Sequence, residues 1–388
     1  MGKPKIRFKG YTEDWEQRKL GEVCSRVQGN DGRMDLPTLT ISAANGWMNQ
    51  EERFSGNIAG KEQKNYTLLH KGELSYNHGN SKLAKYGTVF SLQSYKEALV
   101  PRVYHSFKVE EGSPDFLEYY FATKLPDREL GKLISSGARM DGLLNIGYNE
   151  FMGIQMLFPS VEEQKQISNY FRTLDYLITL HQRKCDETKK LKKCMLQKMF
   201  PKEREKVPEI RFSGFTGDWK QRKVSELCSI STGKSNTQDK VEDGEYPFYV
   251  RSPIIERSTK YLYDEEAVIT VGDGVGTGKV FHYVNGKYDL HQRCYRMHGF
   301  SDELNAHYFY HTFSKLFYKR VMSMTAKTSV DSVRLEMISD MKIPVPNVEE
   351  QRKIGSFLDG LDHLITLHKK KYDELRNIKK FMLQNMFI

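Results

Sequence analysis

Two stretches of the chain carry apolar residues at alternating spacings of three and four positions, which is the period of an amphipathic helix. The stripes run along residues 161–200 and 348–387, and a proline precedes each of them. A helix of about 40 residues is about 60 Å long. Because long heptad-like runs usually find a helical partner, we predict two long helices that pack on each other. Two independent helical hairpins are the alternative.

The rest of the chain shows short β-branched and aromatic runs separated by Gly, Asn and Asp, which is typical of strands joined by turns. Two further segments, residues 115–123 and 305–320, have the pattern of shorter helices. We therefore predict two mixed α/β domains with aromatic-rich cores. The expected strands are residues 68–77, 87–92, 103–109, 246–250, 267–271 and 279–284.

The sequence also contains two pairs of repeated segments. Residues 4–25 and 208–229 are identical at 14 of 22 aligned positions, at an offset of 204. Residues 161–200 and 348–387 are identical at 22 of 40, at an offset of 187. Because the offsets differ, the repeat is not a uniform solenoid. Each half has a similar opening segment and a similar closing segment, which together we term the frame.

The inserts between these segments share little sequence, as expected if the frame sets geometry and the inserts set specificity. Trp15 and Trp219 match within the frame, and we interpret them as core anchors of their domains. The predicted organisation is a first domain at residues 1–158, a first long helical segment at 159–204, a second domain at 205–345 and a second helical segment at 346–388.

The chain is basic, with a net charge of +10 from 60 Lys and Arg against 50 Asp and Glu. Such an excess suits a polyanionic partner, because cations displace counterions from phosphates; an inert basic surface is the alternative. The five scattered cysteines form no C-x-x-C pair, which argues against a disulfide framework or zinc finger. The polar N-terminus and the lack of long apolar runs predict a cytoplasmic location away from membranes.

A glycine-rich stretch, GDGVGTGK, occupies residues 272–279. It fails the P-loop pattern at Asp273 and at Val280, and it fails the dinucleotide pattern because we expect a strand to follow. A β-turn and a backbone loop that approaches DNA phosphate both stay open. The polar stretch SYNHGNSK at residues 75–82 is open in the same way, since Asn and Lys suit base edges but are also common in solvated turns.

We find no motif of an amino-methyltransferase, serine hydrolase or zinc protease. His181 and His368 lie at matched points of the two helical stretches, which indicates frame architecture and not a metal site. We therefore expect no catalytic residue, no cofactor and no metal in this chain.

In this order, and twice over, the motifs resemble the specificity subunit of type I restriction-modification systems. The resemblance is carried by the opening segments at residues 4–23 and 208–227, and by FPSVEEQ at 158–164 and VPNVEEQ at 345–351, each followed by a helical pattern. SSGAR at 135–139 resembles the small-residue element that closes a target recognition domain, whereas AKT at 326–328 replaces its GAR. The similarity covers essentially the whole chain.

This resemblance implies two globular target recognition domains in a pseudo-twofold arrangement, separated by two long antiparallel coiled-coil helices. It implies a non-catalytic subunit that reads a bipartite, asymmetric site in double-stranded DNA, one half for each domain, with the helices as a spacer. Methylation and cleavage would belong to modification and restriction subunits, and two modification subunits would bind the conserved helices.

The family supplies no universal base-contacting residue, so our candidates come from composition and position. They are polar or cationic residues expected in loops or at strand ends, where rigid scaffolds present contacts, and we expect about half of them to contact DNA. They are Tyr76, Asn77, Asn80, Lys82, Lys85, Arg102 and Arg139 in the first domain, and Lys234, Arg251, Thr277, Lys279, Arg293 and Lys327 in the second.

Two other classes of function compete with DNA recognition. A stand-alone nuclease or methyltransferase predicts a cofactor or metal motif, and the sequence shows none. A scaffold that only assembles proteins through its helices predicts no basic bias in the inserts.

Overall fold

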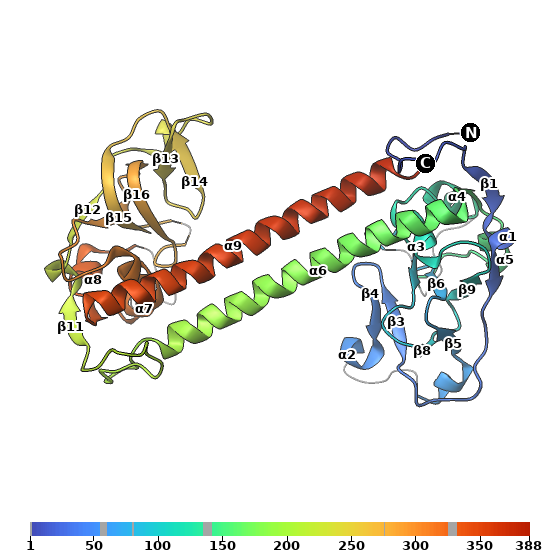
Figure 1. Ribbon diagram of the computed structural model, residues 1–388, viewed down its shortest axis with the longest axis horizontal. Helices are drawn as coiled ribbons and strands as arrows, with labels where there is room; N and C mark the ends of the chain where they lie inside the picture. The colour runs from blue at the N-terminus through green and yellow to red at the C-terminus, as the bar shows by residue number, and fades with distance from the viewer. Residues whose placement is uncertain (1, 55–59, 80, 135–141, 275, 325–331) are drawn as a thin grey trace. The chain divides into compact units, whose positions relative to one another are not determined.

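The computed structural model describes residues 2–54, 60–79, 81–134, 142–274, 276–324 and 332–388. The chain divides into two compact units. Unit 1 comprises residues 1–181 and 371–388, and unit 2 comprises residues 182–370. Two helices of 38 residues each, α6 (Val161–Lys198) and α9 (Val348–Asn385), contribute one part to each unit (Figure 1). The two predicted long helices are confirmed to within two residues at their ends.

Unit 1 is mixed α/β. Its largest sheet has four strands in the order β2-β9-β6-β7, and three two-stranded sheets pair β1 with β10, β3 with β4 and β5 with β8. The strands are β1 (Glu16–Lys19), β2 (Cys24–Arg26), β3 (Leu39–Ser42), β4 (Gly46–Asn49), β5 (Thr67–His70), β6 (Leu74–Asn77), β7 (Thr88–Ser91), β8 (Glu97–Val100), β9 (His105–Val109) and β10 (Gln155–Phe158). The short helices are α1 (Leu20–Val23), α2 (Gln50–Phe54), the 3-10 helix η1 (Gly60–Asn65), α3 (Pro114–Ala122), α4 (Asp127–Lys132) and α5 (Tyr148–Met152).

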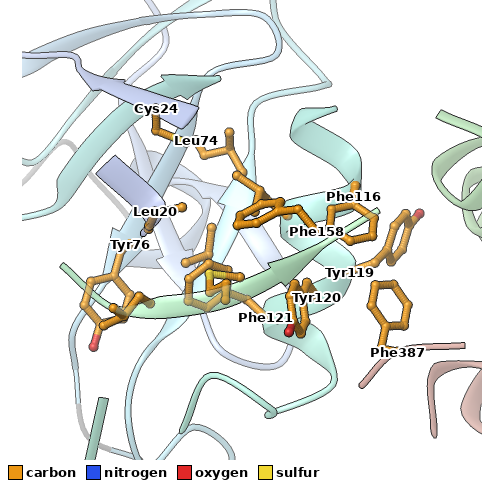
Figure 2. Packing of buried hydrophobic residues seen from close by; sticks show 14 of the residues in the cluster. Leu20, Cys24, Leu74, Tyr76, Phe116, Tyr119, Tyr120, Phe121, Phe158 and Phe387 are labelled. Atoms are coloured by element: carbon orange, nitrogen blue, oxygen red, sulfur yellow. The ribbon is translucent and has the colours of Figure 1, made fainter. Parts of the chain in front are cut away.

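The core of unit 1 is an aromatic cluster (Figure 2). Phe116 and Tyr120 of α3 pack against Phe387, which follows the end of α9, with ring centroids 5.5 and 5.6 Å apart. Trp15 is fully buried in the same cluster, and its ring centroid lies 6.2 Å from that of Phe387. The prediction that Trp15 anchors a core is confirmed.

Unit 2 is built around one six-stranded sheet in the order β12-β17-β15-β16-β13-β14, in which only β13 and β16 run parallel. A two-stranded sheet pairs β11 with β18. The elements are β11 (Lys220–Lys223), η2 (Val224–Glu226), β12 (Ser229–Thr232), η3 (Thr237–Asp239), β13 (Tyr246–Tyr249), β14 (Ile255–Ser258), β15 (Tyr263–Val271), β16 (Phe281–Leu290), β17 (Cys294–His298), α7 (Ala306–Ser323), α8 (Leu335–Ser339) and β18 (Lys342–Val345).

The core of unit 2 repeats the aromatic anchor of unit 1. Trp219 is 3 % exposed, and its ring centroid lies 6.1 Å from both Phe200, just after α6, and Tyr308 of α7. Each tryptophan therefore packs on the end of a long helix and on the shorter helix of its own domain. This confirms the expectation for Trp219.

Several of the strand predictions are wrong in their bounds; the strand expected at residues 267–271, for example, begins at Tyr263. Residues 68–77 form two strands and not one, because Gly72 adopts a left-handed backbone with φ of 92° and turns the chain between β5 and β6. The strand expected from Lys279 begins at Phe281, because the Lys279 N–H donates to Gly276 O at 2.8 Å and closes a turn instead.

The repeated opening segments reach the closing helices through matched ion pairs. Arg7 makes a bidentate contact with Glu163 at the start of α6, with both N–O distances 2.7 Å. Arg211 makes the same contact with Glu350 at the start of α9, at 2.7 and 2.8 Å. Both glutamates are almost fully buried, which explains physically why an arginine and a glutamate recur in the two frames.

The glutamine that follows each of these glutamates organises the shorter helix of the same unit. The Gln164 side-chain oxygen accepts a hydrogen bond at 3.1 Å from the backbone N–H of Ser113, the residue before α3. Gln351 accepts the equivalent bond at 2.9 Å from Asn305, the residue before α7. The frame motifs thus fix how each domain meets its long helix.

Within each unit the two long helices run antiparallel. In unit 1, Asp175 of α6 lies 2.5 Å from the Lys379 ammonium of α9, and Phe171 lies near Phe387. In unit 2, the Lys192 ammonium lies 2.5 Å from Asp362. The predicted pairing of the two helices is confirmed over the alternative of independent hairpins.

In the part of the chain that the structure describes, no helix is long and apolar enough to cross a membrane. The same residues contain no cluster of His, Cys, Asp and Glu that fits a metal ion. All five cysteines are free thiols.

Candidate nucleic-acid interface

Loop segments of unit 2 that are distant in sequence are joined by backbone hydrogen bonds. The Gly233 N–H, just after β12, donates to Cys294 O at the start of β17 at 3.2 Å. The Gly272 N–H, just after β15, donates to Arg293 O at 2.8 Å. These bonds bring Lys234, the glycine-rich loop and Arg293 into one cluster, although they are up to 60 residues apart in the sequence.

Asp273 adds Arg251 to this cluster. One carboxylate oxygen of Asp273 lies 3.4 Å from a guanidinium nitrogen of Arg251, and the other lies 3.9 Å from Nε of Arg293. Both arginine side chains are exposed, at 46 % and 67 %, so they remain accessible to a ligand while they share one carboxylate. We term Lys234, Arg251, Asp273, Lys279 and Arg293 the unit 2 basic cluster.

The glycine-rich loop between β15 and β16 is a series of turns. The Thr277 N–H donates to Gly274 O at 3.3 Å, and the Lys279 N–H donates to Gly276 O. Because these amides are used within the loop, the structure favours the turn over a backbone cradle for phosphate. Gly274, Gly276 and Gly278 have positive φ, which this sequence of turns requires.

The two candidate residues in this loop differ in exposure. Thr277 is 6 % exposed, and its hydroxyl donates to Gly274 O at 2.7 Å, so it holds the loop and does not face outward. Lys279 is exposed, with its ammonium 4.4 Å from the Tyr318 ring centre. Lys279 therefore stays in the candidate interface, and we remove Thr277 from it.

Unit 1 has a hollow of about 430 Å³ between the β3–β4 turn, α2 and the β6–β7 loop. Lys82 and Arg53 supply its cations, and no acidic residue is among its lining residues. Asn77 also lines it, but its amide already donates to Ile41 O at 3.2 Å and accepts from Gly79 N–H at 3.0 Å. Asn77 therefore shapes the loop. Lys82 and Arg53, both exposed, are the cations of the hollow, and Arg53 also donates to Ile41 O at 3.4 Å.

Tyr76 is not part of any surface. Its side chain is fully buried, stacks on Phe151 at a centroid distance of 4.3 Å, and donates its hydroxyl to Tyr86 O at 2.7 Å. A base contact would require the ring to leave the core, so our expectation for Tyr76 is wrong. The polar neighbours of Tyr76 in sequence concealed that it lies on a strand whose alternate residues face inward.

The remaining candidates of unit 1 are exposed but lie apart. Lys85 packs its ammonium 5.1 Å from the Tyr86 ring centre. Arg102 lies between β8 and β9, beside Val103, whose carbonyl is bonded to His78 at 3.0 Å. His78 thus links the Arg102 loop to the end of β6. Asn80, Arg139 and Lys327 lie outside the described residues, as do the SSGAR and AKT elements.

Several interface residues were missed by the sequence analysis. Arg53 follows a turn-rich stretch and gives no motif of its own. Leu83 is 67 % exposed beside Lys82, in a position that suits apolar contact with a base, although a lone leucine in a loop signals nothing in sequence. Gln292 and Asn236, whose side chains bond each other at 2.5 Å, lie next to members of the unit 2 basic cluster in the same loops; the HQR run at 291–293 was the available indication.

Known proteins resemble this chain both in sequence and in fold. Residues 216–377 match the type I restriction modification DNA specificity domain. The chain is also 24 % identical over 292 residues to the type I restriction enzyme MjaVIII specificity subunit of Methanocaldococcus jannaschii, covering 69 % of this chain and 68 % of that one. The chain is thus similar to the specificity subunits of type I restriction-modification systems over about two thirds of its length.

Two further matches extend this similarity along the whole chain. The putative type I restriction enzyme MjaX specificity subunit of Methanocaldococcus jannaschii is 20 % identical over 398 residues, which cover 95 % of this chain and 91 % of the relative. A crystal structure of a type I restriction-modification S subunit from M. genitalium shares the fold, with a TM-score of 0.71 at 15 % identity over 100 % and 99 % of the two chains. The shared fold confirms the predicted mixed α/β architecture, and the predicted resemblance to specificity subunits is borne out by these matches.

Proposed function

We propose that this chain is the specificity subunit of a type I restriction-modification system. It reads a bipartite, asymmetric site in double-stranded DNA and directs methylation and cleavage by modification and restriction subunits in the cytoplasm. Two target recognition domains, at residues 1–158 and 205–345, each read one half of the site. The helical segments at 159–204 and 346–388 act as the spacer between the half-sites and as the docking region for partners.

The proposal rests on one observation: the two domains share matched frames but have different cationic surfaces. The frame contacts of Arg7 with Glu163 and of Arg211 with Glu350 are the same in both units. The surfaces are not, because unit 1 offers the hollow with Lys82 and Arg53, whereas unit 2 offers the basic cluster around Asp273. An asymmetric site requires two domains that are held in the same way but present different surfaces to the DNA.

The test is an exchange of one recognition domain. Residues 26–158 are replaced by those of another type I specificity subunit, and the methylated sites are mapped by long-read sequencing in cells that contain the partner subunits. We expect one half of the methylated site to change while the other half stays the same. A change in both halves would contradict independent reading. The reciprocal exchange of residues 230–345 is the matched control and should alter the other half only.

The partner proposal is supported by two matched grooves along the long helices. The groove in unit 1 has a volume of about 510 Å³ and the groove in unit 2 about 390 Å³. Six residues of one are the repeat equivalents of six residues of the other, at the offset of 187. The pairs are Arg376 with Lys189, Lys379 with Lys192, Lys380 with Lys193, Leu383 with Leu196, Gln384 with Gln197 and Ile178 with Ile365.

The linings of both grooves combine cationic and aliphatic residues. Leucine and isoleucine supply the aliphatic part, and the ammonium and guanidinium groups come mainly from the long helices. This chemistry suits a helical segment with an apolar stripe flanked by carboxylates. Because the grooves are repeat equivalents, they suit two copies of one partner, and we assign them to two modification subunits.

A further inference from the structure

At one pair of equivalent positions the charges of the two units are reversed. Arg172 on α6 and Asp359 on α9 are repeat equivalents, at the offset of 187. Arg172 contacts two carboxylates of α3, Asp115 at 2.5 Å and Glu118 at 2.9 Å. Asp359 instead contacts imidazoles of α7. The long helix is therefore the cationic partner in unit 1 and the anionic partner in unit 2.

The two imidazoles on Asp359 approach from one face of α7. His307 Nδ1 lies 2.5 Å from one carboxylate oxygen, and His311 Nε2 lies 2.7 Å from the other. His311 is only 1 % exposed, and its ring is held 5.0 Å from the Tyr310 ring. Burial raises the pKa of Asp359, but the hydrogen bond and charge of the two imidazoles outweigh it and lower that pKa below its ordinary value.

The residues on the shorter helices are also structural equivalents. The Ser113 side chain caps α3 by accepting from Phe116 N–H, and the Asn305 side chain caps α7 by accepting from Tyr308 N–H. Each capping residue also donates its backbone N–H to the glutamine of its frame. These caps align α3 and α7 at an offset of 192, which pairs Asp115 with His307, Glu118 with Tyr310 and Tyr119 with His311.

The reversal is confined to the contact between recognition domain and long helix. The contacts between the long helices keep their polarity, because Asp175 with Lys379 and Asp362 with Lys192 are repeat equivalents of the same sign. Both domain contacts are partly covered, with Arg172 31 % and Asp359 36 % exposed. Solvent would therefore screen a like-charge pair at these positions only in part, and such a pair would be unfavourable.

We infer that Arg172 and Asp359 are positioning residues of opposite polarity, so that each long helix accepts only a recognition domain whose helix at the α3 or α7 position carries complementary polar groups. A domain with the α3 pattern would face Asp359 with carboxylates, and a domain with the α7 pattern would face Arg172 with imidazoles. The two domains are thus not interchangeable between the frames, although the rest of the frame is alike. The inference rests on the proposed function only for its effect on DNA reading.

A charge-exchange cycle in the full chain tests this. The helix-side variant is Asp359→Arg, and the domain-side variant is H307D/Y310E/H311Y, which copies the α3 residues. We expect each variant alone to lower the melting temperature of unit 2 by about 6 °C, because it creates a like-charge pair or an unpaired charge. We expect the combination to recover at least half of that loss. A combined variant that melts as low as the less stable single variant would overturn the inference.

Two additions keep the result interpretable. Asp373→Arg is the matched control, since it makes the same charge reversal at an exposed position of the same helix and should leave the melting temperature unchanged. If the helix-side variant does not fold, the reciprocal cycle in unit 1, Arg172→Asp with D115H/E118Y/Y119H, makes the same comparison. Methylation of the native site is measured separately, so that a failure of the DNA-reading proposal is distinguishable from a failure of charge matching.

Discussion

The two units place similar frames around dissimilar recognition domains. In both, a buried glutamate at the start of a long helix holds an arginine of the opening segment, and a tryptophan packs on the end of the other long helix. Beyond the frame they diverge: unit 1 divides its strands among four small sheets, whereas unit 2 gathers six strands into one. This difference shows that the frame determines how a domain attaches to its long helix but not how the strands of that domain are arranged into sheets.

The two cationic surfaces differ in whether a carboxylate pairs with their cations. Arg251 and Arg293 in unit 2 share the carboxylate of Asp273, whereas Lys82 in unit 1 has no ion pair among the described residues. An internal carboxylate competes with phosphate for the same guanidinium groups. Under the proposed function, non-specific attraction to DNA would therefore be weaker at the unit 2 basic cluster than at Lys82 in the unit 1 hollow.

The largest expected effect tests whether the matched arginine–glutamate pairs of the two frames contribute equally to the stability of their units. Arg7→Met and Arg211→Met each leave a buried glutamate without its cation, and we expect each to cost about 3 kcal/mol of stability in its own unit. Hydrogen exchange read separately for the two units, with urea titration, measures the loss. Arg183→Met, at an exposed position of α6, is the control and should have no effect. A loss in only one unit would refute the equivalence.

The next effect concerns the two grooves. Lys193→Glu and Lys380→Glu are repeat equivalents that line the grooves, and each should weaken binding of one modification subunit about tenfold by repelling its carboxylates. Native mass spectrometry should then show one bound subunit in place of two, and none for the double variant. Lys184→Glu, an exposed change outside the grooves, should preserve both. Full occupancy in the double variant would show that the modification subunits bind outside the two grooves.

A smaller effect should follow from Asp273→Asn. This change releases Arg251 and Arg293 to phosphate, so we expect DNA affinity to rise about threefold at low salt and the salt dependence to steepen by about one counterion. Titration by fluorescence anisotropy at several salt concentrations measures both. Asp243→Asn, in an exposed loop of the same unit, controls for net charge. An equal gain in both variants would show that only total charge matters.

The smallest expected effect is a pH dependence of stability that arises at the unit 2 groove and not at the unit 1 groove. The position that is Thr123 in unit 1 is Lys315 in unit 2, where burial lowers the lysine pKa to about 8 from its ordinary 10.5. Between these values the unfolded chain binds a proton that the folded chain does not, so stability rises with pH from about 8 to 10.5. Below pH 8 the full cost of burying the charge is present.

Lys315→Met should therefore raise the melting temperature at pH 7 by about 2 °C and reduce the rise between pH 8 and 10.5. The difference between variant and native chain, measured across this range, isolates Lys315 from other titrating groups. Lys319→Met, exposed on the same helix, should match the native curve. An unchanged curve for Lys315→Met would mean that solvent reaches the ammonium freely.

The sequence predicted the long helices and core anchors because these depend on local periodicity and on repetition. Trp15 and Trp219 could be assigned from their matched positions alone, and the structure buries both. Tyr76 was misjudged because a strand in a polar stretch hides which face is buried. The unit 2 basic cluster could be assembled only from the fold, since Asp273 joins residues from three separate loops and no spacing in the sequence indicates that contact.

The division of the chain has a consequence for the order of folding. Unit 1 is assembled from two separate stretches, and residues 371–388 close its core: Ile6 N–H donates to Asn385 O at 2.9 Å, and Phe387 packs on Trp15. Unit 2 is one continuous stretch, residues 182–370, so all of its contacts close shorter loops than the contact between Ile6 and Asn385. Because the entropy cost of closing a loop grows with its length, we expect unit 2 to fold before unit 1 and the aromatic core of unit 1 to form last.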